Sequence, residues 1–281
     1  MNNFNLLRIK SVLVWDFYSN WKKYLRFFIG IVIVLFAAEI LTMFTYISTE
    51  LPLHVETGEI AVETAQRSTM NTAFGLSLVI LIAYWNIGAS MLTGTLKSKQ
   101  DRTNYLAIPA TNIEKFTARW LLCVPILMVV LLAGIFVADL LRMLITPLIG
   151  SNSLPLLFTY FIKTLGRITN VMDANSFRIL STLICLQLAN HAIFILGSCI
   201  FRRHPFLSTC GAMLLLTIFM SIVVNFIVGL DISIEFPFAL SEITLSIIIW
   251  TVTILFIGLL YWLSFRIFSR IQVIQNKWIN F

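Results

Sequence analysis

The chain has 281 residues, of which 59% are hydrophobic and only 12% are charged, and its mean hydropathy is +0.91. Ordinary soluble domains contain roughly 45–50% apolar residues, so this composition excludes a soluble globular protein and indicates an integral membrane protein. The net charge of +7 does not indicate nucleic acid as a partner, because the basic residues lie beside apolar runs, where they orient a protein in the lipid bilayer. The length leaves room for one membrane domain over 1–281.

Six apolar runs are long enough to cross a bilayer as helices. They lie near residues 26–48, 72–95, 120–141, 178–201, 206–229 and 243–265. A segment inside hydrocarbon must satisfy its backbone hydrogen bonds internally, so all six are expected to be helical. The fold class predicted is therefore all-α, a polytopic membrane protein with six transmembrane helices. The short basic turn "RRHP" should join the fourth and fifth helices as a hairpin.

Residues 1–25 are expected to form an amphipathic interfacial helix on the inner side, which stays attached because no signal-cleavage pattern follows it. Trp21 and Tyr24 suit the headgroup zone, and Lys22 and Lys23 can meet anionic lipid. Two interpretations remain open for this segment, a simple membrane anchor and a functional elbow.

The distribution of lysine and arginine predicts the orientation. With the amino terminus inside, fifteen of the twenty basic residues lie in the inner segments and five in the outer ones. This bias favours both termini in the cytoplasm, with residues 49–71 and 230–242 outside and 96–119 inside.

The outer connection over 142–177 is the exception, because it holds four of the five outer basic residues. Its stretch "LPLLFTYFIKTLGRI" alternates apolar and basic positions and is short for a span, so we expect a helix that lies on the outer membrane surface. A re-entrant hairpin is the competing interpretation.

Recognisable catalytic and ligand-binding motifs are missing. The sequence contains no H-E-x-x-H, no complete serine elbow and no G-x-x-x-x-G-K-[ST] loop, so we expect no catalytic residue, bound cofactor or metal in this chain. The four cysteines lack metal-site or disulfide spacing and are expected to be packing residues. They are Cys123, Cys185, Cys199 and Cys210.

Several polar residues fall inside the apolar runs, where burial is costly enough to suggest a function. Glu39 lies in the outer half of the first run, and Asp139 stands three residues before Arg142 in the third. Asp139 and Arg142 can also form a simple contact on one helix face. The fourth run carries a polar stripe that can line a substrate route or serve interhelical hydrogen bonds. The stripe consists of Gln187, Asn190, His191 and Ser198.

The inner connection over 96–119, the coupling segment, begins a well-specified helix. Pro109 is expected to end an extended piece, after which Thr111 caps the helix and Glu114 completes a capping box. Charged residues flank an apolar centre around Tyr105, so the segment is predicted to be an amphipathic docking surface that faces the cytoplasm. A plain connector is the competing interpretation. The charged residues are Asp101, Arg102, Glu114, Lys115 and Arg119.

The stretch "YLAIPATNIEKFTARWL", preceded by "LKSKQDR", resembles the "LPAS..EKF..RWL" signature of six-span permease subunits of ATP-binding-cassette (ABC) transporters, in the type-two exporter class of Bacteroidetes-like bacteria. Thr111 replaces the usual serine and Ile108 the usual leucine. The resemblance implies a permease homodimer or heterodimer in the bacterial cytoplasmic (inner) membrane. It also implies a separate cytoplasmic ATPase that binds ATP and Mg²⁺ and couples to the permease. The coupling residues it implies are Asp101, Arg102, Tyr105, Pro109, Thr111, Glu114, Lys115 and Arg119.

Two other functions fit the same pattern. A non-transporting membrane scaffold or sensor would use the coupling segment to dock a cytoplasmic partner. A secondary transporter would be favoured by inverted repeats or broken half-helices, which the sequence does not display clearly.

Overall fold

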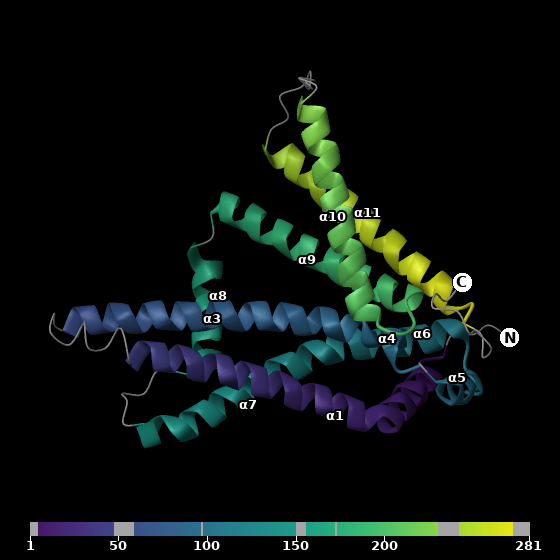
Figure 1. Cartoon of the computed structure of the whole chain (residues 1–281), viewed down its shortest axis with the longest axis horizontal. Helices are drawn as coiled ribbons and strands as arrows, with labels where there is room; N and C mark the ends of the chain where they lie inside the picture. Colours follow the sequence, from purple (N-terminus) through teal and green to yellow (C-terminus); the bar gives the residue numbers. More distant parts are fainter. Residues whose placement is uncertain are drawn as a thin grey trace. The chain divides into compact units, whose positions relative to one another are not determined.

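The computed structural model describes residues 5–47, 59–96, 98–149, 156–171, 173–229 and 242–271. Every regular element in these ranges is a helix, and six helices are long and apolar enough to cross a membrane, so the fold is all-α and polytopic as predicted (Figure 1). The α-helices are α1 (Leu6–Thr45), α3 (Glu59–Ala89), α4 (Met91–Gly94), α5 (Lys99–Leu106), α6 (Asn112–Leu121), α7 (Leu127–Ile145), α8 (Leu157–Val171), α9 (Ala174–Ile200), α10 (Pro205–Gly229) and α11 (Glu242–Phe268). A π-helix (Leu122–Ile126) joins α6 to α7, and a 3₁₀-helix (Thr146–Ile149) follows α7.

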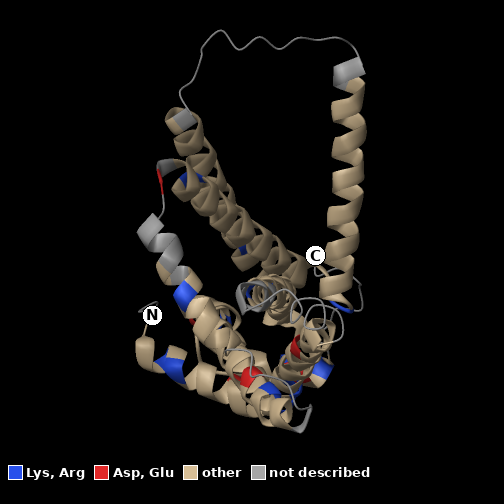
Figure 2. Ribbon diagram, turned by 90° about the vertical axis from the view of Figure 1, so that its left-hand side faces the viewer, with Lys and Arg blue, Asp and Glu red and all other residues tan. Residues whose placement is uncertain are grey.

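Most of the helical ribbon is uncharged (Figure 2). α10 contains no charged residue, and the charged residues of α11 are confined to its two ends. Large apolar side chains such as Leu215 and Phe219 on α10 and Leu255 on α11 are exposed, which suits a surface that faces lipid rather than water.

Internal contacts divide the chain into two compact units. The first unit contains Met1–Leu13, Asn86–Cys123 and Asp173–Phe281, and the second contains Val14–Trp85 and Val124–Met172. In the first unit α9 packs against α10, α11 and α4, and α6 packs against α11. In the second unit a buried apolar core draws residues from α1, α3, α7 and α8.

The interfacial helix expected over residues 1–25 is not a separate element. α1 runs without a break from Leu6 to Thr45, so it joins that segment to the first span. The reason lies in the sequence, because no glycine or proline occurs between Leu6 and Ile29 to end a helix.

The coupling segment also differs from its prediction. The residues before Pro109 are helical rather than extended, because α5 covers Lys99–Leu106. Ser98 caps this helix through its hydroxyl, which accepts a hydrogen bond from the Asp101 backbone N–H at 3.0 Å. Proline restricts the residue directly before it, Ile108, and so leaves a helix that ends at Leu106 undisturbed.

Other predicted elements are present. The hairpin turn separates α9 from α10, and the helix expected after the third span is α8. The position of α8 relative to the membrane remains a prediction. Parts of the two predicted outer segments lie outside the described residues, namely 49–58 and 230–241, and so do Lys97 and the chain beyond residue 271.

Candidate functional site

The coupling segment begins its second helix with the predicted capping box. The Thr111 hydroxyl accepts from the Glu114 backbone N–H at 3.3 Å, and the Glu114 carboxylate accepts from the Thr111 backbone N–H at 2.8 Å. These two bonds satisfy backbone donors that the first turn of a helix otherwise leaves open. The capping-box prediction is confirmed.

Glu114 has a second role that the local sequence does not reveal. Its other carboxylate oxygen accepts from the Asn5 backbone N–H at 2.9 Å, and the Arg8 guanidinium lies 3.8 Å from the carboxylate. The Glu114 side chain is 0% exposed. One carboxylate therefore attaches the start of α1 to the start of α6.

Tyr105 is the centre of the segment. Its hydroxyl donates to the Lys115 carbonyl at 3.0 Å, and the guanidinium carbon of Arg119 lies 4.0 Å from the centre of its ring. This stacking is a cation–π contact. Arg119 also donates to the Leu92 carbonyl at 2.7 Å, so it connects α6 to α4.

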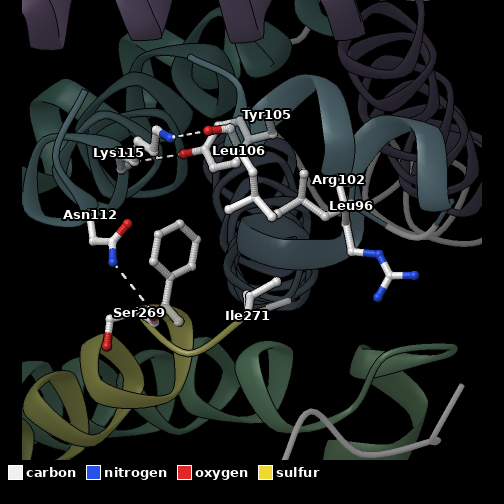
Figure 3. A pocket seen from close by; sticks show the side chains of 9 residues that line it. Leu96, Arg102, Tyr105, Leu106, Asn112, Lys115, Ser269 and Ile271 are labelled. Carbon is white, nitrogen blue, oxygen red and sulfur yellow. Dashed lines mark hydrogen bonds between the residues drawn. The ribbon is translucent and has the colours of Figure 1, made fainter. Parts of the chain in front are cut away.

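Lys115 is held in the same cluster, as Figure 3 shows. Its ammonium group donates to the Leu106 carbonyl at 3.0 Å, near the end of α5. This bond satisfies one of the last carbonyls of that helix. Lys115 thus closes the turn between α5 and α6 and, like Arg119, is buried.

The segment rests on the end of α11. The Phe116 ring packs edge-on against Phe265 and Phe268, and Tyr105 packs edge-on against Phe268. Asn112 donates through its side-chain amide to the Ser269 carbonyl at 3.3 Å (Figure 3). A small pocket lies at this junction and is lined from both sides by Leu96, Arg102, Tyr105, Leu106, Asn112, Lys115, Phe268, Ser269 and Ile271.

Arg102 lies near the turn between α9 and α10, the second of the predicted inner connections. Burial lowers the pKa of its guanidinium, and the positive charge of Arg202, in the turn between α9 and α10, lowers that pKa further. Because the ordinary value is so high, Arg102 stays cationic. Its guanidinium points away from the pocket in Figure 3.

Five of the predicted coupling residues lie inside the fold. Arg102, Tyr105, Glu114, Lys115 and Arg119 are buried, so these side chains hold the segment together and are not available to a partner. The sequence interpretation took these charges to lie at the surface, whereas four of them have partners inside the fold. They are Arg102, Glu114, Lys115 and Arg119. The exposed residues of the segment are instead Ser98, Lys99, Gln100, Thr103, Asn104, Ala107, Pro109, Asn112 and Ile113.

The second unit gathers the predicted intramembrane charges. The Arg142 guanidinium donates to Asp139 at 2.7 Å and lies 3.3 Å from Glu39. Asp139 also accepts from the backbone N–H of Phe158, at the start of α8, at 2.9 Å. The pairing within α7 was expected from the sequence, and the contacts with α1 and α8 are added by the tertiary fold.

The polar stripe of α9 makes contacts within the first unit. His191 is buried and forms a hydrogen bond with the backbone of Cys123, while the Thr93 hydroxyl donates to the Ser198 carbonyl. Gln187 and Asn190 are half-buried, and the Gln187 Nε2 and Asn190 Oδ1 atoms have no hydrogen-bond partner in the part of the chain that the structure describes. Of the stripe's side chains, His191 makes an interhelical hydrogen bond, whereas the Ser198 hydroxyl donates to Ile195 of its own helix.

Residues missed by sequence reasoning complete the coupling segment. Four residues contact it from distant parts of the chain, and Leu92 contacts it from α4 directly before it; none carries a local signal of that role. The four are Asn5, Arg8, Phe268 and Ser269. The described residues contain no group of three or more metal-ligating side chains, and the four cysteines are free thiols. No protein-family model, curated protein or solved structure matches this chain.

Proposed function

We propose that this chain is the membrane-spanning permease subunit of an ABC exporter in the bacterial cytoplasmic membrane, working as a dimer with a separate cytoplasmic ATPase. The ATPase binds ATP and Mg²⁺, and the permease moves the substrate. The resemblance of residues 105–121 to the permease signature supports this proposal, and so does the six-helix architecture.

One observation carries the proposal, the internal bracing of the coupling segment. Glu114, Tyr105 and Arg119 connect α5 and α6 to the start of α1, to α4 and to the end of α11. A plain connector between two spans needs no such attachments. A segment that transmits a movement of its partner to the spans needs these attachments. A packed and hydrogen-bonded element transmits such a displacement to its neighbours instead of deforming.

The exposed face of the segment is then the contact surface. Ile113 is 54% exposed on α6, and Asn104 and Ala107 are exposed at the end of α5. Binding energy in an interface is concentrated in a few central anchor residues, and we assign that position to Ile113. The buried charged residues position this face and do not touch the partner.

The test uses the ATPase that co-purifies with the chain from its native membrane. Ile113→Asp places a charge at the centre of the exposed face and should weaken ATPase association by about tenfold or more without altering insertion or thermal unfolding. His204→Asp is the matched control, because His204 is exposed in the neighbouring turn and gains the same charge. It should retain the ATPase.

Two results would contradict the proposal. If no ATPase co-purifies, a scaffold or sensor becomes the better interpretation. If Ile113→Asp retains full association and ATP-driven transport, the exposed face is not the contact surface and the coupling segment is a connector.

A further inference from the structure

Three charged side chains are buried together in the second unit, and their charges do not balance. Glu39 on α1 and Asp139 and Arg142 on α7 are all inaccessible to solvent, with Glu39 only 2% exposed. Two carboxylates therefore share one guanidinium. Burying a charge without full compensation is costly, and more so at membrane depth.

The hydrogen bonds show which carboxylate the guanidinium compensates. Asp139 accepts from Arg142 through one oxygen and from the Phe158 N–H through the other, so both oxygens are satisfied. The Phe158 N–H also belongs to the first turn of α8, whose dipole favours a negative charge there. Asp139 is thus stabilised as a carboxylate.

Glu39 has no such support. Arg142 Nε lies 3.3 Å from Glu39 Oε2, yet neither oxygen of Glu39 takes part in a hydrogen bond within the described residues. If Glu39 were ionised, it would place a second negative charge beside Arg142, whose stronger bond goes to Asp139. If Glu39 is protonated, its side chain is neutral and adds no such charge.

The surroundings leave space beside the carboxyl group. Glu39 lines a small cavity with Thr42 from its own helix, Thr69, Met70 and Ala73 from α3, Arg142 from α7 and Leu157 from α8. The charged groups that face Glu39 are Asp139 and Arg142 of α7. The lining residues of α3 and α8 are apolar except for the Thr69 hydroxyl, so among the described side chains these helices place no charge on the cavity wall.

We propose that Glu39 is a proton-binding site, which carries a proton while Asp139 remains the ionised partner of Arg142. Loss of the proton makes the two carboxylates compete for one guanidinium, so proton binding decides how α1 is joined to α7. This role is independent of the proposed ATPase partner.

The experiment follows the carboxyl group directly. The full-length protein in lipid nanodiscs is titrated from neutral to alkaline pH, and infrared difference spectra record the carbonyl band of a protonated carboxylic acid. We expect a band that disappears as the pH rises. It should shift when glutamate is labelled with ¹³C and stay unmoved when aspartate is labelled, which assigns it to a glutamate; its loss in Glu39→Gln then identifies the residue.

Two variants test the charge count. Glu39→Gln should lack the band and should lose the pH dependence of thermal unfolding that the parent shows in the same range. Asp139→Asn should move the titration of Glu39 to lower pH by at least about one unit, because the carboxylate that competes with Glu39 for Arg142 is then removed.

The proposal is overturned if the glutamate-labelled protein shows no protonated carboxyl band at neutral pH, since Glu39 would then be ionised. It is also overturned if Asp139→Asn leaves the titration unchanged. Thermal unfolding that follows Na⁺ concentration and not pH would assign the cavity to a cation instead.

Discussion

The Glu114 carboxylate shows how one side chain can serve a local and a distant purpose. Within the helix it closes the capping box with Thr111, and across the fold it holds the backbone of Asn5. The first contact is encoded within four residues and is visible as a sequence pattern. The second joins residues 109 positions apart, and only the folded chain brings them together.

Removing the hydroxyl of the cap tests the local half of this arrangement. Thr111→Ala should destabilise the start of α6 by about 1 kcal/mol, because it leaves the Glu114 N–H without its acceptor. Hydrogen–deuterium exchange at the Glu114 amide should be about fivefold faster than in the parent. Thr111→Ser keeps the hydroxyl and should exchange like the parent. Equal rates in the alanine and serine variants would show that the cap contributes nothing.

Asp173 should make the stability of the first turn of α9 depend on pH. It caps α9, and hydrogen bonds from Ser176 hold the pKa of its carboxyl below its ordinary value of 3.8. A lowered pKa means that the cap stabilises α9 above pH ~4 and loses this effect as the pH falls through the folded-state pKa. Exchange protection of the Ser176 amide should drop on acidification in the parent and stay constant in Asp173→Asn. Parallel profiles would refute the assignment.

At the scale of elements, α9 and α10 approach closely at one glycine. A Cβ atom on Gly197 would lie 1.9 Å from the Thr209 hydroxyl oxygen and 2.9 Å from the Thr209 Cβ. That hydroxyl is fixed by its own bond to the Pro205 carbonyl at 2.7 Å. The contact therefore depends on the absence of a side chain at residue 197, as is common between membrane helices.

Gly197→Ala should push α9 and α10 apart at a cost of about 1–3 kcal/mol, the usual range for overpacking. Thermal unfolding in detergent should occur at a lower temperature than in the parent. Gly211→Ala on α10 is the matched control, because a Cβ there meets nothing within 4 Å. If both variants unfold at the same temperature, the close approach at Gly197 does not stabilise the pair.

For the whole molecule, the orientation in the membrane follows from the basic-residue bias and is open to direct measurement. Gln100 and Ser68 are both exposed, and the prediction places them on opposite sides. The half-buried Cys185 and Cys210 are first replaced by serine. An impermeant thiol reagent should then label Ser68→Cys in sealed cells. It should label Gln100→Cys only after the cells are opened. Labelling of Gln100→Cys in sealed cells would invert the orientation.

How well a feature was predicted from the sequence depended on how far apart in the chain the residues that stabilise it lie. The six helices and the capping box depend on neighbours within one or two turns, so composition and spacing were sufficient to predict them. The continuous α1 and the helical α5 were not predicted, although the missing breakers and the Ser98 cap were present in the sequence as local signals.

The sequence by itself determined that this protein lies in a membrane and is helical. A chain with so much apolar surface and so few charges is stable in lipid, and its apolar runs satisfy their backbone hydrogen bonds there as helices. Only the tertiary structure decided which of its charged residues face inward. Lys115 and Arg119 donate hydrogen bonds to backbone carbonyl groups, and Glu39 lies beside Arg142, which already donates to Asp139. The free energy of a buried charge depends on partners that lie far away in the chain, and no local pattern specifies them.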